Sequence, residues 1–180
     1  MHIFDGQQMP SGVDFLPQLQ EYYKGERLGA IWFTIVGVAL LLLSLFIWKQ
    51  SPPVSMGRGL LYPLLFVGIC CIIAGPLLMR SNKDRLVRFP QEYQVDEQAF
   101  IIKETARLEG VGRWWLPLKI TWSLIILVGL VLAFIGTTPY WKGLGLGLLL
   151  IGAIGHVVDG FAHERANVYL DHLDEAGADD

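Results

Sequence analysis

Residues 152–173, GAIGHVVDGFAHERANVYLDHL, change from apolar helix-type sequence to a group of ionisable side chains. The group consists of His156, Asp159, His163, Glu164 and Arg165. His156, Asp159 and His163 fall at i, i+3 and i+7, which places them broadly on one face of a helix. Imidazole and carboxylate groups on successive turns are metal ligands and general acid–base groups. The spacing alone therefore leaves a metal site and a catalytic pair open.

The rest of the sequence completes neither chemistry. The spacing is not H-E-x-x-H, and no fourth ligand is evident. Neither a nucleophile nor a phosphate-binding loop accompanies the pair, because GLGLG at 143–147 lies inside an apolar segment with no preceding strand and no lysine. We therefore predict a protein that is not an enzyme and that has no cofactor and no bound metal.

The charges follow an apolar segment that is one of four. Hydrophobic residues make up 53% of the 180 residues and charged residues 17%, and the mean hydropathy is +0.44. A helix needs roughly 20 apolar residues to cross a ~30 Å hydrocarbon layer. Four segments approach or meet this length, at about 28–48, 60–79, 118–135 and 141–161. The sequence predicts an all-α integral membrane protein, a four-helix bundle forming a single membrane domain over residues 1–180.

Basic residues predict the orientation of these spans. All of the 14 Lys and Arg residues except Lys49, Arg58 and Lys142 belong to one side, as do all 17 acidic residues. The side that carries the basic residues is normally cytoplasmic. We expect both termini and the loop over 80–117 in the cytoplasm, and two very short loops outside. The net charge of −3 gives no reason to expect a nucleic-acid partner.

The loop over 80–117 contains a helix signal. Asp96 is placed to cap a helix, Val95 and Phe100 are spaced as a hydrophobic staple, and Gly110 offers a stop. Apolar residues recur at i, i+4, i+7 and i+11, namely Val95, Ala99, Ile102 and Ala106. This predicts a short amphipathic helix that lies on the inner membrane surface, packs beneath the bundle or forms a groove for a partner. A strand over AFII is the remaining alternative.

The charges near the inner membrane boundary are expected to pair. A carboxylate at this depth is costly unless it has a partner, so Asp159 should face the bundle and meet Arg27 or Lys119. The expected ion-pair cluster consists of Glu26, Arg27, Lys119, Asp159, Glu164 and Arg165. Small residues in the fourth span suit close contact between helices, namely Gly145, Gly152 and Gly155.

Three stretches together carry a resemblance. They are YYKGERLGA at 22–30, FIIKETARLEGVGRWW at 100–115 and DGFAHERANVYLDHL at 159–173. The combination resembles a group of small four-span bacterial inner-membrane proteins that occur beside polymorphic toxins of the Rhs-repeat and type VI secretion kind. The build is also similar to immunity proteins of pore-forming colicins. The charged positions to which the resemblance points are Glu26, Arg27, Glu104, Arg107, Asp159, Glu164 and Arg165, and Leu108 stands where many relatives have methionine.

The resemblance implies an immunity protein of the bacterial inner membrane. Such a protein binds a cognate pore-forming toxin inside the bilayer, and a homo-oligomer is compatible with this role. A second class is a structural or assembly subunit that recruits a cytoplasmic partner through 80–117. A third is a transporter or enzyme built around the inner charges. The resemblance favours the first of these three classes, with the structural or assembly subunit as the alternative.

The orientation is directly testable. Reporter fusions after Met56 and Thr138 should report the outer side, and fusions after Glu97 and Ala176 the inner side, because the basic residues hold the latter in the cytoplasm. Paired alkaline phosphatase and fluorescent-protein fusions measure this. An inner signal at Thr138 would contradict the four-span arrangement.

Overall fold

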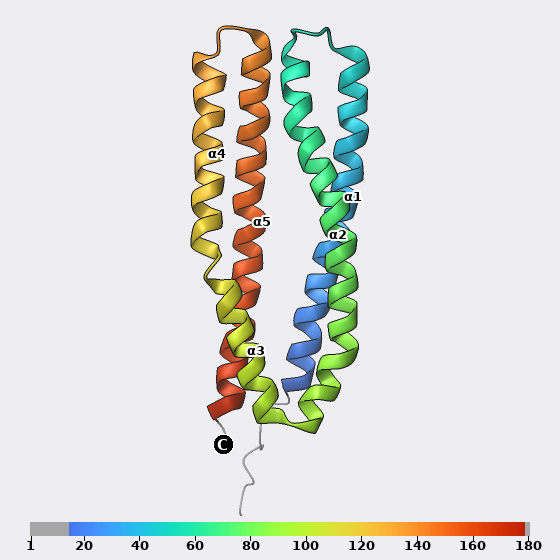
Figure 1. Cartoon of the computed structure of the whole chain (residues 1–180), viewed down its shortest axis with the longest axis vertical. Coiled ribbons are helices and arrows are strands. Elements are labelled where there is room, and N and C mark those ends of the chain that lie inside the picture. The colour runs from blue at the N-terminus through green and yellow to red at the C-terminus, as the bar shows by residue number, and fades with distance from the viewer. Residues whose placement is uncertain (1–14, 179–180) are drawn as a thin grey trace, which may run out of the picture.

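The computed structural model describes residues 15–178, and this part of the chain is helical with no strand. The helices are α1 (Phe15–Gln50), α2 (Met56–Val95), α3 (Glu97–Gly112), α4 (Trp115–Ile135) and α5 (Pro139–Ala178). The α1–α2 pair forms one antiparallel hairpin, the α4–α5 pair forms another, and α3 joins them at the end opposite the two short turns (Figure 1). The all-α class is confirmed. Four helical segments are long and apolar enough to cross a membrane, as a multi-pass membrane protein requires.

Three helices are much longer than the apolar segments that they contain. Helix α1 has 36 residues, and α2 and α5 have 40 each. At 1.5 Å per residue they are ~54 to 60 Å long, about twice the ~30 Å hydrocarbon layer. Most of the segment over 80–117 that joins the second and third spans is helical, because residues 80–95 continue α2 and residues 97–112 form α3. A helix satisfies its own backbone groups in water as well as in lipid, so it need not end where the apolar sequence ends.

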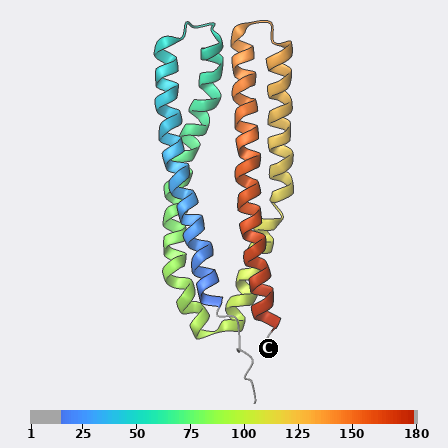
Figure 2. The same ribbon diagram turned by 180° about the vertical axis from the view of Figure 1, so that it is seen from behind.

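Helices α1 and α2 cross each other along their length, as both views show (Figures 1 and 2). Glycines allow a close approach along this interface. A β-carbon on Gly75 would lie 2.2 Å from Oγ1 of Thr34, and one on Gly37 would lie 2.9 Å from Cβ of Cys71. Helix α2 also contains Pro63, Pro76 and Pro90. Each proline removes a backbone donor and favours a bend in the helix.

Helix α5 lies between the other hairpin and α4, and its glycines face both neighbours. On the α4 side, a β-carbon on Gly145 would lie 2.4 Å from the backbone nitrogen of Ala133, and Gly152 and Gly155 also lie against α4. On the α2 side, a β-carbon on Gly143 would lie 1.9 Å from the carbonyl oxygen of Met56. The three glycines expected to allow close helix contact therefore all face α4.

Helix α4 has a peripheral position. It packs along α5, and Gly129 is its only buried residue. Many of its large apolar side chains are exposed, among them Leu124, Leu127 and Phe134. At membrane depth this surface faces lipid or another membrane helix.

Two glycines of α5 form a matched test of the packing. Gly145→Ala should destabilise the protein by ~1 to 3 kcal/mol, because the new methyl group meets the α4 backbone. Gly160→Ala should be neutral or slightly stabilising, because nothing described lies within 4 Å of the added carbon and alanine is the better helix former. Thermal unfolding in one detergent, followed by circular dichroism, compares them. Equal effects of the two substitutions would contradict the close α4–α5 contact.

Candidate functional site

The buried hydrophobic cluster lies outside the apolar segments. We call this region the helical head and define it as residues 15–27, 80–112 and 162–178. Its buried members are Phe15, Leu19, Tyr23, Phe89, Phe100, Ile101, Leu108, Tyr169 and Leu173. They come from α1, α2, α3 and α5, so the two hairpins share one core at this end. The sequence predicts a helix and paired charges on this side of the spans, but not a shared hydrophobic core.

Aromatic rings form much of that core. Tyr22 stacks on Tyr169 with ring centroids 4.2 Å apart and planes 8° apart. Phe15 stacks on the same tyrosine at 5.7 Å, and Tyr23 meets Phe89 edge-on at 5.3 Å. Such pairs add stability beyond the burial of their apolar area. The head is therefore held by ring contacts between helices far apart in the chain.

Helix α3 buries a different face from the one predicted. Phe100, Ile101, Glu104 and Leu108 are buried. Val95 and Ile102 are 86% and 71% exposed, and the other two members of the predicted face, Ala99 and Ala106, are exposed as well. The proposed staple therefore leaves Val95 unburied. The predicted cap is confirmed, because the carboxylate of Asp96 accepts a hydrogen bond from the backbone nitrogen of Ala99 at 2.9 Å.

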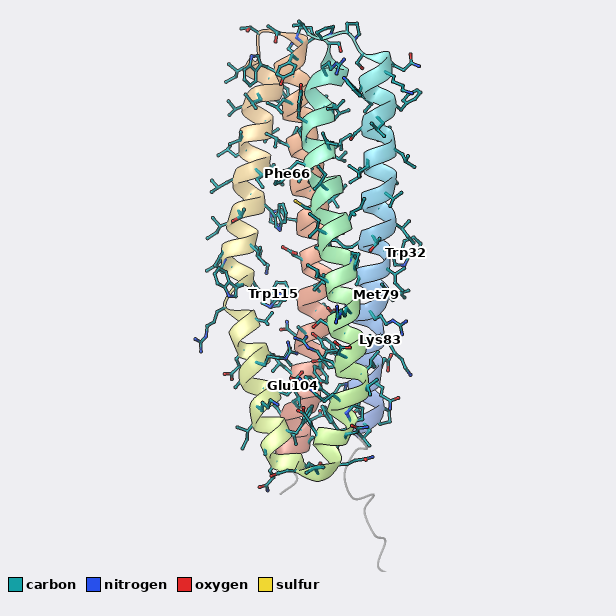
Figure 3. The ribbon with its side chains drawn as sticks, turned by 45° about the vertical axis from the view of Figure 1, so that its right-hand side comes forward. Trp32, Phe66, Met79, Lys83, Glu104 and Trp115 are labelled. Carbon is teal, nitrogen blue, oxygen red and sulfur yellow. The ribbon has the colours of Figure 1, made fainter. Side chains whose placement is uncertain are left out.

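Glu104 is the one charged side chain in this core, and it is only 2% exposed (Figure 3). Tyr23 donates its hydroxyl to Oε1 of Glu104 at 2.5 Å. Arg107 donates to both carboxylate oxygens at 2.8 Å and to the Tyr23 hydroxyl at 2.9 Å. This two-pronged geometry is the strong form of an Arg–carboxylate pair. A buried carboxylate thus has its charge neutralised and its oxygens bonded, as burial requires.

The network changes the acidity of its members. Burial raises the pKa of Tyr23, and the nearby negative charge of Glu104 raises it further. Burial also raises the pKa of Tyr22, with Glu26 as the next largest cause. For Arg107, burial opposes the charge, but hydrogen bonds and attraction to Glu104 outweigh it and raise the pKa above its ordinary value. Both tyrosines are therefore neutral and the arginine is charged at physiological pH.

A second ion pair ties α5 to α1. Arg165 donates through Nη2 and Nε to Oε1 of Glu26, at 2.8 and 3.2 Å. Its side chain runs beside Gly25 and Gly29, where a β-carbon would lie 3.9 and 4.0 Å from it. Together with the Tyr23–Glu104 bond, this pair brings the three stretches that carry the resemblance into one region, across separations of 81 and 139 residues.

Asp159 does not form the ion pair that was predicted. Its Oδ2 accepts a hydrogen bond from Nε1 of Trp122 at 2.5 Å. Among residues 15–178, neither Arg27 nor Lys119 takes part in an ion pair. The physical reason is Gly155, because its missing side chain leaves room for the indole of Trp122 to lie against α5 one turn before Asp159.

The other ionisable residues of α5 near Asp159 also contact α4. Nε2 of His156 lies 3.2 Å from Oγ of Ser123. The ring of His163 lies 5.0 Å from that of Trp115. Residues 15–178 contain no group of three or more His, Cys, Asp or Glu placed to hold a metal ion. The predicted cluster therefore divides into the Glu26–Arg165 pair and the Asp159–Trp122 contact, while three members are exposed: Arg27, Lys119 and Glu164.

The comparisons with known proteins add no family to this description. No protein-family model matches the chain, and no curated protein and no solved structure matches it either. The geometry defines an all-helical protein with four helical segments of membrane-spanning length and composition. One end of these helices forms a head with a buried polar network.

Substitution by phenylalanine should lower the stability of the protein at one tyrosine of the head but not at another. Tyr23→Phe should cost ~1 to 3 kcal/mol, because Glu104 loses a buried donor. Tyr169→Phe should be neutral or stabilising by ~1 kcal/mol, because the Tyr169 hydroxyl is buried without a hydrogen-bond partner among the described residues. Denaturant unfolding in one detergent measures both. Equal losses from the two would show that the network contributes nothing specific.

Proposed function

We propose that this chain is an immunity protein that binds a cognate pore-forming toxin inside the bacterial inner membrane, with both of its own termini in the cytoplasm. The observation that carries the proposal is the peripheral position of α4. Gly129 is the only buried residue of α4, and many of its large apolar side chains are exposed, among them Leu124, Leu127 and Phe134. A pore-forming toxin presents helices to the same lipid layer, and helix pairs there associate through packing and a few polar contacts.

The short turns support recognition within the membrane. Residues 51–55 join α1 to α2, and residues 136–138 join α4 to α5. The first turn is internally bonded, since the Ser55 hydroxyl accepts from the backbone nitrogen of Arg58 and Nε of Arg58 donates to the carbonyl of Ser51. These turns offer little surface to a partner outside the membrane, so the helix faces are the larger binding surface.

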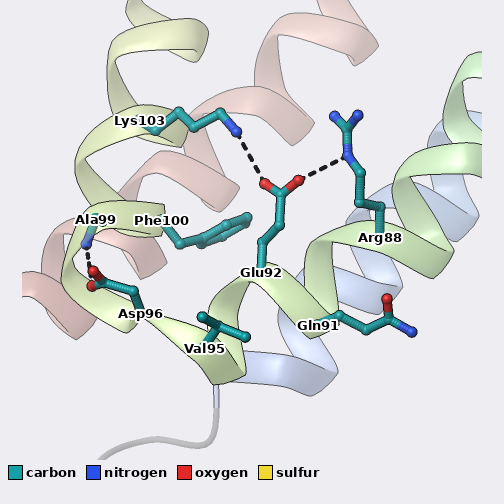
Figure 4. A pocket seen from close by; sticks show the side chains of 8 residues that line it. All are labelled: Arg88, Gln91, Glu92, Val95, Asp96, Ala99, Phe100 and Lys103. Atoms are coloured by element: carbon teal, nitrogen blue, oxygen red, sulfur yellow. Dashed lines mark hydrogen bonds and ion pairs between the residues drawn. The ribbon is translucent and has the colours of Figure 1, made fainter.

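A second candidate function rests on the corner between α2 and α3. An open groove of ≈ 390 Å³ lies there, with Phe100 at its base and the exposed Val95 beside it (Figure 4). Arg88 and Lys103 both bond to Glu92 at its rim, at 2.9 and 3.0 Å. Exposed apolar groups in a groove suit a protein segment. This favours a subunit that recruits a cytoplasmic partner through the corner.

One experiment separates the two candidates. A sensitive cell that produces the chain should resist depolarisation by one inner-membrane pore former, the toxin encoded beside it, and should remain sensitive to unrelated pore formers. The double substitution of Leu124→Ala and Leu127→Ala on α4 should lower the tolerated toxin dose about tenfold, because it trims the proposed contact surface. Val95→Ser in the groove at the α2–α3 corner should leave protection unchanged.

Membrane potential dyes measure protection, and immunoblotting of membranes confirms equal protein levels. Pro53→Ser combined with Val54→Ser is a further control, because it alters the first turn but keeps the Ser55 cap. Protection that depends on Val95 and is indifferent to the α4 substitutions would favour the second candidate. A neighbouring toxin that acts as a nuclease or cell-wall hydrolase would contradict the proposal.

A further inference from the structure

One carboxylate near the membrane boundary lacks a cationic partner among residues 15–178. Asp159 follows Trp141, the start of the apolar part of α5, by 18 residues. At 1.5 Å per residue this is ~27 Å, close to the far edge of a ~30 Å hydrocarbon layer. Its bonded neighbour is the neutral indole of Trp122. The ion pairs of the described residues do not include Asp159. All of them lie in the head, to which Asp159 does not belong.

This arrangement contrasts with the treatment of acids in the head. Glu104 and Glu26 are each bonded to an arginine through two donors. Asp159 sits closer to lipid, where an uncompensated carboxylate is more costly, yet it has only an N–H donor on Oδ2. The ionisable neighbours on its own helix, His156 and His163, are directed to Ser123 and Trp115 on α4. None of these contacts supplies a fixed positive charge.

The surroundings leave the carboxylate partly accessible. Asp159 and Trp122 are both partly exposed, and Trp122 belongs to the peripheral helix α4. Spanning helices of other proteins carry Lys and Arg at the cytoplasmic boundary, and these long side chains extend along the helix to reach polar groups. A cation of this kind reaches the boundary at the depth of Asp159. The negative charge of Asp159, its depth near the boundary and its partial exposure therefore suit a contact with a basic residue on another helix.

We propose that Asp159, oriented by Trp122, is the docking point for a Lys or Arg side chain near the cytoplasmic end of a partner's membrane-spanning helix. This inference rests on the proposed function, in which the partner is a helix of the pore-forming toxin. The indole bond fixes one carboxylate oxygen and the partner's cation neutralises the charge. The apolar surface of α4 supplies the remaining contact.

A synthetic helix tests the docking without the toxin. The full chain, labelled with a donor dye, is placed in phosphatidylcholine vesicles with an acceptor-labelled leucine-rich spanning peptide. The peptide carries one lysine at each boundary, so that either orientation presents a cation at the depth of Asp159; the comparison peptide carries glutamine instead. Energy transfer should show about 3- to 10-fold tighter association of the lysine peptide.

Variants assign the preference to one residue. Asp159→Asn should abolish the difference between the two peptides, whereas Trp122→Phe should reduce it without abolishing it, because the carboxylate stays but loses the indole bond that orients it. Glu164→Gln is the matched control, an exposed acid on the same helix near the same boundary. It should leave the preference unchanged. Circular dichroism melting in the same vesicles confirms that each variant is folded.

Equal association of the two peptides with the unaltered chain would overturn the inference, as would a lysine preference that survives in Asp159→Asn. The same holds if the preference disappears in Glu164→Gln. Failure of the proposed function would look different from failure of the docking inference. In that case the lysine peptide would still be preferred through Asp159, but the unaltered chain would protect no cell from a pore former.

Discussion

The buried carboxylate of Glu104 constrains the rest of the head. A charge removed from water is tolerated only when specific partners neutralise it and bond its oxygens, and Glu104 obtains these from Arg107 on its own helix and from Tyr23 on α1. The requirement fixes both the face that α3 turns inward and its position against α1. Because α3 connects the two hairpins, this bond also limits where α2 ends and where α4 begins.

The two halves of the molecule are stabilised by different physics. The head lies beyond the apolar segments, where burying rings such as Phe15 and Phe89 gains the hydrophobic effect. Between the apolar segments that gain is absent, because lipid is as apolar as the side chains themselves. There the helices approach closely through glycines, with Gly145 and Gly155 against α4. A firmly packed head thus joins two hairpins whose outer surfaces are free for lipid or other helices.

The sequence predicts the features that depend on local pattern. Apolar length locates the four spans, and the cap at Asp96 follows from the residue type and its position. The buried face of α3 could not be predicted from its own sequence, because it carries two apolar rows. The row containing Phe100 is buried because aromatic side chains from the other helices surround it, which only the tertiary structure reveals.

The partner of Asp159 escaped prediction for a related reason. Charge complementarity favoured Arg27 or Lys119, but the outcome depended on whether an indole has room beside α5. Gly155 provides that room, and the indole of Trp122 occupies it. The bond from Tyr23 to Glu104 was likewise not predicted, although Tyr23 stands within a stretch that also contributes Glu26 to the head. Residues that make long-range contacts of this kind do not stand at a regular separation along the chain, so a single sequence does not reveal them.

Hydrogen exchange most directly tests whether the Glu104 network joins the two hairpins. Exchange followed by mass spectrometry would compare the unaltered chain with Glu104→Gln, in which Arg107 loses its buried counter-charge. The account predicts faster exchange together in residues 15–27, 97–112 and 162–178, because all three belong to one core. Faster exchange confined to α3, with α1 and α5 unchanged, would contradict it.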